Sequence, residues 1–96
     1  MAAYLIADIE VQDAEAFDEY RKLVPAILEP FGGTYIVRGG AVTPLEGGWE
    51  PKRVVMLEFP SMDALQSWYN SDAYKAPKAL RGRAAISRVV AVEGVA

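Results

Sequence analysis

The sequence predicts an α+β fold in which one antiparallel sheet carries its helices on a single face. In residues 3–10 an apolar side chain occupies every second position, which is the period of a half-buried strand. Apolar residues then recur at helical spacing from Phe17 to Phe31. Further apolar runs complete the order strand, helix, strand, strand, helix, strand. The 96 residues leave room for one core, so we expect a single domain over residues 1–96.

Capping and breaking residues delimit the elements in the first half of the chain. Asp13 follows the first strand and has a side chain typical of a helix N-cap. Pro25 is expected to kink or restart the helix, and Pro30 with the glycine pair after it to end the helix. We therefore expect two linked helical pieces, followed by a second strand over residues 34–38.

Two more strands are expected in the second half. Residues 53–59 are almost continuously apolar and form the third strand. The connection before it, residues 41–52, is long enough to hold a short edge strand that includes Pro44. Residues 84–93 form the last strand.

The second helix is expected between the third and fourth strands. Ser61 is in position to cap it, and apolar residues recur behind the cap. Asn70 and Ser71 are expected to break this helix before one further turn that contains Tyr74 and Pro77.

This order of elements is that of a ferredoxin-like βαββαβ sheet with strand order 4-1-3-2. The side that faces the helices is expected to be a core: Leu5, Ala7, Ile9, Tyr35, Val37, Val55, Leu57, Phe59 and Val89. The other side is mostly apolar but has a charge on each strand: Tyr4, Ile6, Asp8, Ile36, Arg38, Val54, Met56, Glu58, Ile86, Arg88, Val90 and Val92. Because this second side needs a cover, we expect two copies to pair through it as a homodimer.

Composition excludes several classes of function. The net charge of −3 provides no attractive field for phosphate groups, so we expect no nucleic-acid and no membrane partner. The chain has no Cys, which excludes thiolate chemistry and agrees with a cytoplasmic location. It also has no His, the usual general base and a common metal and haem ligand. We therefore expect no metal and no cofactor, and any chemistry must come from carboxylates, Tyr, Arg, Lys or Ser.

Several blocks along the chain match a known family: AYLIADIEVQDAEAF, GGTYIVRGG, LEGGWEPKRVVMLEFPS, WYNSDAY and SRVVAVEG. In these blocks, over nearly the whole chain, the sequence resembles the small bacterial proteins of domain-of-unknown-function family 1330 (DUF1330). The resemblance implies a dimeric α/β barrel, in which two ferredoxin-like sheets face each other and enclose a lumen, and it implies no established activity. Cofactor-free monooxygenases, haem-degrading enzymes and muconolactone isomerases share this superfamily. Several of them depend on His, so their mechanisms do not transfer to this chain.

The charged residues of the second face are the candidate catalytic groups. The first and third strands are expected to be adjacent and parallel, which places Asp8 and Glu58 side by side near the carboxyl ends of those strands. Two adjacent carboxylates repel, so one could stay protonated near neutral pH and act as an acid or a base. Arg88 on the fourth strand is expected to neutralise Asp8, while Arg38 is expected toward the other end of the sheet from Glu58. The alternative is a buried structural ion network at the dimer interface.

A ligand-binding hypothesis follows from the same face. Arg38 or Arg88 is expected to meet the carboxylate or phenolate of a small, partly apolar acid in the lumen, with Tyr4 and Tyr69 near its ring. Two alternatives remain open. One is a cofactor-free isomerase or monooxygenase that uses the lumen carboxylates, and the other is a non-enzymatic structural or protein-interaction dimer.

Two further segments have mainly structural explanations. Trp49 lies in a glycine-rich loop and is expected to pack as an anchor against the other subunit, with a lid over the lumen as the alternative. A modest basic stretch precedes the last strand: Lys75, Lys78, Arg81 and Arg83. It is expected to be a solvated face, with a gate for anionic substrates as the alternative.

Overall fold

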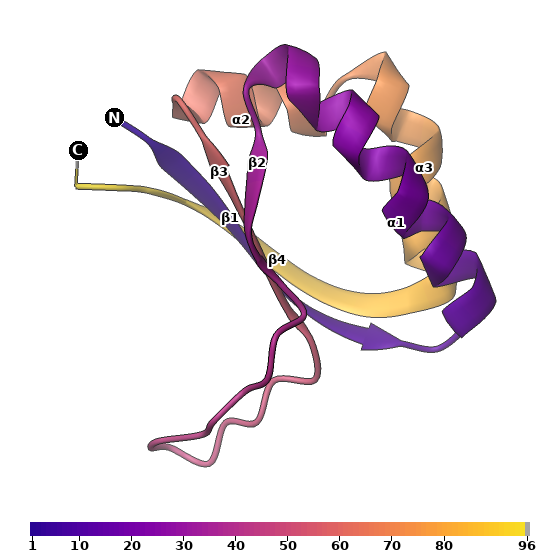
Figure 1. Cartoon of the computed structure of the whole chain (residues 1–96), viewed down its shortest axis with the longest axis vertical. Coiled ribbons are helices and arrows are strands. Elements are labelled where there is room, and N and C mark those ends of the chain that lie inside the picture. The colour runs from indigo at the N-terminus through magenta and orange to yellow at the C-terminus, as the bar shows by residue number, and fades with distance from the viewer. Residues whose placement is uncertain (96) are drawn as a thin grey trace.

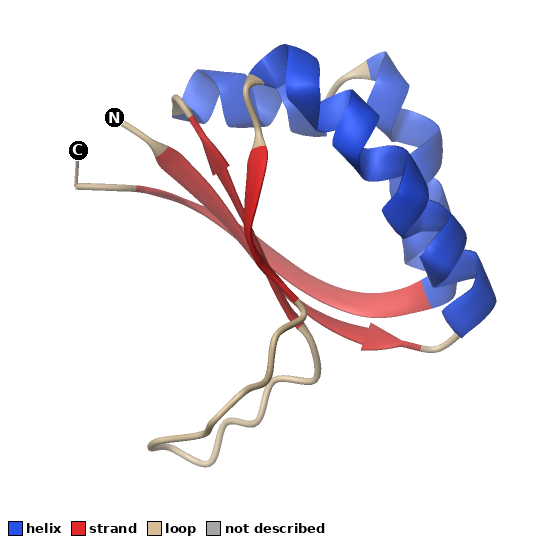
Figure 2. Ribbon diagram, viewed as in Figure 1, coloured by secondary structure: helices blue, strands red, loops and turns tan. Residues whose placement is uncertain are grey.

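The computed structural model describes residues 1–95, which form one layer of strands and one layer of helices (Figure 1). The strands are β1 (Ala3–Val11), β2 (Thr34–Arg38), β3 (Val54–Phe59) and β4 (Ala85–Glu93). The helices are α1 (Ala14–Leu28), α2 (Met62–Tyr69) and α3 (Asp72–Ala84), with a 3₁₀ turn at Glu29–Phe31. The strand order is β2-β3-β1-β4, and every neighbouring pair is antiparallel. The predicted ferredoxin-like α+β fold is confirmed, with the helices on one face of the sheet (Figure 2).

α1 is one continuous helix, so the expected division at Pro25 is wrong. Proline removes one backbone hydrogen bond from a helix interior. Val24 and Leu28, on either side of it, are buried against the sheet, and tertiary packing of this kind outweighs a local propensity. The N-terminus is capped as predicted, because the Asp13 carboxylate accepts the amide of Ala16 at 3.1 Å.

α3 is a full helix where one further turn was expected. The Ser71 hydroxyl accepts the amide of Tyr74 at 3.2 Å and donates to the carbonyl of Trp68 at 2.7 Å. One side chain therefore closes α2 and caps α3, so Ser71 starts a helix as well as ending one. The Ala, Lys, Leu and Arg residues that follow are good helix formers, and Pro77 is buried within them. None of the helices in residues 1–95 is long and apolar enough to cross a membrane.

The connection between β2 and β3 is an extended loop that projects beyond the sheet (Figure 1). The expected edge strand at Pro44 is absent from the described chain, where residues 41–52 are irregular. Leu45 and Trp49 in this loop are 89% and 63% exposed, so most of each side chain is left uncovered by its own domain. Apolar side chains this exposed are candidates for contact with another subunit.

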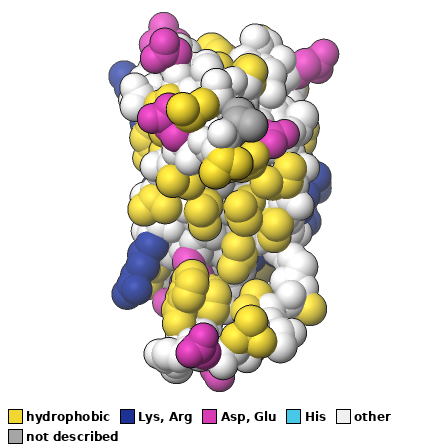
Figure 3. All heavy atoms as spheres, turned by 90° about the vertical axis from the view of Figure 1, so that its left-hand side faces the viewer, with side chains coloured by type: hydrophobic (Ala, Val, Ile, Leu, Met, Phe, Trp, Pro, Cys, Tyr) yellow, Lys and Arg dark blue, Asp and Glu magenta, His cyan; other side chains and the backbone are white. Residues whose placement is uncertain are grey.

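The two faces of the sheet differ sharply in exposure. Toward the helices lies the core, and its largest members are almost fully buried: Trp68, Tyr74, Phe59, Leu28 and Val24. The other face has no cover in the described chain, and large apolar side chains are 47% to 60% exposed there: Ile36, Ile86, Val90 and Val92. Figure 3 shows apolar side chains gathered across this side of the molecule. We call this surface the open face.

Candidate functional site

The two carboxylates that were predicted to be neighbours lie at opposite ends of the sheet. β1 and β3 are antiparallel, with Tyr4 opposite Glu58 and Asp8 opposite Val54. Four residues along a strand separate the two positions by about 13 Å. The helical crossover makes β1 and β2 parallel, and β3, which turns back from β2 and lies between them, must run opposite to both. The predicted sharing of a proton between Asp8 and Glu58 is therefore wrong.

Asp8 has a structural role on the open face. It lies directly opposite Arg88 in the β1–β4 register, as expected, although no ion pair joins them in residues 1–95. Its carboxylate accepts the amide of Lys52 at 3.0 Å and so fastens the long loop to β1. These residues and Trp49 line a surface groove of about 270 Å³.

Glu58 and Tyr4 form a second polar spot on the open face. The Glu58 carboxylate raises the pKa of the Tyr4 phenol by hydrogen bonding to it and through its negative charge. The Tyr4 ring also lies against Gly94, where an added Cβ would come within 2.7 Å of the ring. Both side chains therefore have partners within the monomer.

A β-bulge in β2 carries Arg38 to the helix side of the sheet. The register is interrupted between Tyr35 and Val37, after which Arg38 pairs with Val55 of the core side and Val37 pairs with Met56 of the open face. One extra residue in a strand reverses the alternation of every side chain that follows. The predicted faces of Val37 and Arg38 are both wrong for this reason. The Arg38 guanidinium lies over the Tyr35 ring, 4.4 Å from its centroid.

Arg38 meets Arg21, Arg53 and Arg81 around a cleft between the helices and the sheet. We call this space the arginine cleft. Its floor is apolar and comes from β1, β3 and β4: Leu5, Ala7, Ile9, Val55, Leu57 and Val89. The cleft holds about 30 Å³ of free space, which accommodates one or two water molecules. No carboxylate lines the cleft within residues 1–95, and among its four arginines Arg21 alone has an ion pair there, with Asp18 outside the cleft.

Arg53 is the most constrained of these arginines. Its guanidinium lies so close to Gly39 that a Cβ added there would come within 2.4 Å of it. The same guanidinium lies 5.5 Å from the centroid of the Phe17 ring. Burial and the neighbouring charges of Arg21 and Arg38 lower the pKa of Arg53. The Nε atoms of Arg53 and Arg81 are buried without a hydrogen-bond partner. Buried donors of this kind carry an energetic cost that an anion could relieve.

Gly39→Ala tests this placement. Gly39 has a φ of 72°, a conformation that side chains other than glycine rarely adopt, and a methyl group there meets the guanidinium of Arg53. We expect a loss of about 1 to 3 kcal/mol in the free energy of unfolding, measured by urea denaturation. Gly40→Ala is the matched control, because a Cβ at Gly40 meets nothing within 4 Å. Equal stability of the two variants would show that Gly39 does not hold Arg53.

Aromatic side chains form the helix side of the arginine cleft. The hydroxyls of Tyr20 and Tyr74 share a buried hydrogen bond of 2.8 Å, and Tyr74 packs on Trp68 with ring centroids 4.2 Å apart. Burial raises the pKa of both Tyr20 and Tyr35, so these phenols stay neutral. The Trp68 Nε1 is a further buried donor without a partner. Tyr69 also lines the cleft, and the Lys78 ammonium sits 4.2 Å from its ring centroid.

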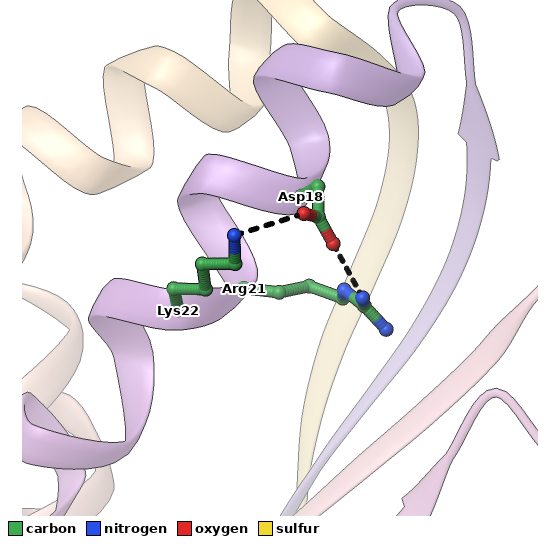
Figure 4. A network of polar contacts seen from close by, with 3 residues as sticks. All are labelled: Asp18, Arg21 and Lys22. Atoms are coloured by element: carbon green, nitrogen blue, oxygen red, sulfur yellow. Dashed lines mark hydrogen bonds and ion pairs between the residues drawn. The ribbon is translucent and has the colours of Figure 1, made fainter.

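The arginine cleft adjoins a wider surface groove of about 520 Å³. The two share Phe17, Arg21 and Arg53. Asp18 lies in the groove and pairs with Arg21 at 2.5 Å and with Lys22 at 3.3 Å (Figure 4). The Arg21 side chain extends from α1 toward the strands (Figure 4). A molecule larger than water can therefore reach Arg21 and Arg53 from the groove.

The predicted ligand residues are divided between the two faces of the sheet. Arg38 and Tyr69 line the arginine cleft, while Tyr4 and Arg88 lie on the open face. Arg21 and Arg53 were not predicted as site residues, and Arg81 was expected on a solvated face, with a gate for anionic substrates as the alternative. Helical spacing offered a signal for two of them: Arg21 lies one turn after Phe17, and Arg81 one turn after Pro77. Nothing local marks Arg53, which enters the cleft because of the fold of the adjacent loop.

The fold and this cleft define a ferredoxin-like domain with a basic, aromatic pocket between sheet and helices. The chain belongs to the family Domain of unknown function (DUF1330), whose model matches residues 2–95. It is similar in structure to RPA0582, a protein of unknown function from Rhodopseudomonas palustris, with a TM-score of 0.78, 19% identity and coverage of 99% of this chain and 83% of that one.

Two other solved structures share the fold. A dimeric ferredoxin-like protein of unknown function from Jannaschia sp. CCS1 has a TM-score of 0.66 at 16% identity, with 98% of this chain and 100% of that chain covered. SnoaB, a cofactor-independent oxygenase from Streptomyces nogalater, has a TM-score of 0.68 at 12% identity, with 97% and 92% covered. Comparison with curated proteins gives no match.

Proposed function

We propose that the protein binds a small, partly apolar acid in the arginine cleft and its adjoining groove. The observation that supports this is the convergence of Arg21, Arg38, Arg53 and Arg81 on a space without a carboxylate in residues 1–95. Guanidinium groups bind carboxylates through paired hydrogen bonds, and these bonds are strongest where water is excluded. The apolar side chains of the adjoining groove, Val11, Ala14 and Phe17, suit the remainder of such a ligand, because the cleft itself admits little more than water.

The alternative fate of the arginines, neutralisation by the protein's own carboxylates, has little support. Asp8 and Glu58 lie on the open face, across the sheet from the cleft. Asp18 engages Arg21 from the groove, where both side chains are more than two-fifths exposed. Exposed pairs of this kind are weak and exchange readily with other anions.

A thermal-shift screen tests the proposal. The panel consists of benzoate, phenylacetate, hexanoate and their uncharged amides, and we expect the acids alone to raise the melting temperature. A ligand at one hundred times its dissociation constant adds roughly 2.7 kcal/mol of stability. Arg53→Met and Arg81→Met should each abolish the shift, because they keep the aliphatic stem and remove the charge.

Arg88→Met is the matched control, since Arg88 lies on the open face and should leave the shift unchanged. Loss of binding in Arg88→Met alone would move the site to the dimer lumen. A panel without hits, or hits that survive both cleft variants, would favour the non-enzymatic structural or protein-interaction dimer.

We also propose that two copies pair through the open face. Its exposed apolar side chains and the dimeric neighbour from Jannaschia support this arrangement. The projecting loop, with Leu45 and Trp49 exposed, extends the same surface and would pack on the partner.

A cofactor-free oxygenase is the second candidate, favoured by the shared fold with SnoaB. Asp8 and Glu58 would then act separately, because the antiparallel register holds them apart. Oxygen uptake in the presence of acids from the screen tests this activity, with Asp8→Asn and Glu58→Gln as variants. Uptake that both variants retain would exclude the carboxylates from the reaction.

A further inference from the structure

We propose, on the basis of the proposed function, that the arginine cleft binds weakly acidic phenols and enols as their anions and so ionises them without a base of its own. The ligand class follows from the charges around the cleft and from the buried donors without partners on residues that line it. The proposal differs from binding of a carboxylic acid, which is already ionised in solution.

The residues that line the cleft carry either positive charge or no charge, although Asp18 of α1 pairs with Arg21 from the groove. α1 contributes Arg21, the bulged end of β2 contributes Arg38, the residue before β3 is Arg53, and α3 contributes Arg81. β1 and β4 contribute apolar residues only to the part of the cleft that the structure describes. The tyrosines of α1, β2, α2 and α3 are the other ionisable groups that face it: Tyr20, Tyr35, Tyr69 and Tyr74.

The tyrosines do not neutralise this charge. Burial raises the pKa of Tyr20 and of Tyr35, which keeps both phenols protonated. The pKa of Arg53 is lowered, first by burial and then by the positive charges of Arg21 and Arg38. For Arg81, burial lowers the pKa, but Tyr74, Tyr20 and Tyr69 outweigh it and raise the pKa, so this guanidinium keeps its charge. Four guanidinium groups around one space favour an anion there, because an opposite charge within about 4–6 Å lowers the pKa of an acid by about 1 to 3.

The geometry also suits an oxygen anion attached to a ring. The buried Nε of Arg53, Nε of Arg81 and Nε1 of Trp68 are N–H donors without acceptors. Donors of this type stabilise a developing oxyanion, as in the sites that bind enolates. The ring itself would lie in the adjoining groove, against Phe17, because the enclosed cleft of about 30 Å³ admits little more than water.

The proton has a direct route to solvent. Ionisation breaks the ligand O–H bond, leaves the electron pair on the oxygen beside the guanidinium groups and releases the proton through the groove. The groove is open to solvent and is lined by the carboxylates of Glu15 and Asp18. No oxidant, reductant or co-reactant is needed for this step.

The probe is 4-nitrophenol, whose anion absorbs visible light, titrated with pH in the absence and presence of saturating protein. We expect the absorbance midpoint of the bound dye to move down by at least about one pH unit. 4-Nitroanisole has the same ring and no acidic proton, and we expect it to bind at least about tenfold more weakly at neutral pH. Calorimetry in two buffers of different ionisation enthalpy should show that a proton is released on binding.

Variants of the arginines test whether their charge or their shape causes the shift in midpoint. Arg53→Gln should lose most of the shift in midpoint, Arg53→Lys should retain part of it, and Arg88→Met on the open face should retain all of it. Arg81→Gln serves as a second charge variant if Arg53→Gln does not fold, and circular dichroism checks each variant.

Two failures are distinguishable. If benzoate binds but the midpoint of bound 4-nitrophenol stays in place or rises, the cleft binds acids without ionising them, and this inference is overturned while the proposed function stands. If neither benzoate nor 4-nitrophenol binds, both are overturned. A downward shift that Arg53→Gln and Arg81→Gln both retain would also overturn the inference, because the arginines would not be its cause.

Discussion

Light scattering of the gel-filtered protein at micromolar concentration is expected to give about twice 10.5 kDa, and Val90→Lys is expected to give the monomer mass. Val90 is 59% exposed in the monomer, on β4 and opposite Ile6 in the centre of the open face. If this face is covered by a second copy, a lysine there must bury its charge without a partner. An unpaired buried charge costs several kcal/mol, which is enough to shift the dimer equilibrium by orders of magnitude.

Leu23→Lys is the matched control for the dimer. Leu23 is 43% exposed on α1, in the helical layer on the other side of the sheet, so its replacement should leave the dimer intact. A wild-type protein that is monomeric would refute the pairing of open faces. A dimer that survives Val90→Lys as well as Leu23→Lys would place the interface elsewhere on the molecule.

Trp68→Ala is expected to lower the free energy of unfolding by about 3 to 5 kcal/mol, measured by urea denaturation at a fixed protein concentration. Trp68 is 1% exposed and packs on Tyr74 at 4.2 Å and Phe59 at 5.4 Å between ring centroids. Its truncation removes the largest side chain of the core and leaves a cavity. A domain of this size has only about 5 to 15 kcal/mol of stability, so this loss is a large fraction of the total.

Two further variants show how much of the lost free energy of unfolding comes from the missing ring. Trp68→Phe keeps an aromatic ring and removes the unpartnered Nε1 donor, so it should cost less than half as much as alanine. Ser67→Ala, at the adjacent exposed position of α2, should change stability by no more than about 0.5 kcal/mol. A cost for Trp68→Ala as small as that of Ser67→Ala would mean that the core does not depend on this ring.

Most of the fold could be predicted from the sequence because its signals are local. Alternation in residues 3–10, helical spacing after Asp13 and the caps at Asp13 and Ser61 each depend on residues within a few positions of one another. The wrong predictions about helices depend instead on contacts between residues far apart in the sequence. Pro25 stays within a helix because distant parts of the chain bury its neighbours, which no local rule describes.

The site was less predictable because the direction of one strand and one β-bulge decide where the candidate side chains lie. The antiparallel direction of β3 separates Asp8 from Glu58, although both residues were assigned to the correct face. The bulge before Val37 moves Arg38 to the opposite face, and a sequence without a glycine at that point offers no sign of it. The errors about the site are therefore errors of position along and across the sheet.

The sequence by itself determined that this protein has one ferredoxin-like sheet with an apolar open face and no histidine or cysteine chemistry, since each of these depends only on composition or short-range pattern. Only the tertiary structure decided that Arg21, Arg38, Arg53 and Arg81 meet around one cleft. They come from α1, the end of β2, the loop before β3 and α3, far apart along the chain. Their meeting depends on the strand order, the bulge in β2 and the close approach of Arg53 to Gly39. All three result from packing between residues far apart in the sequence, which local patterns do not encode.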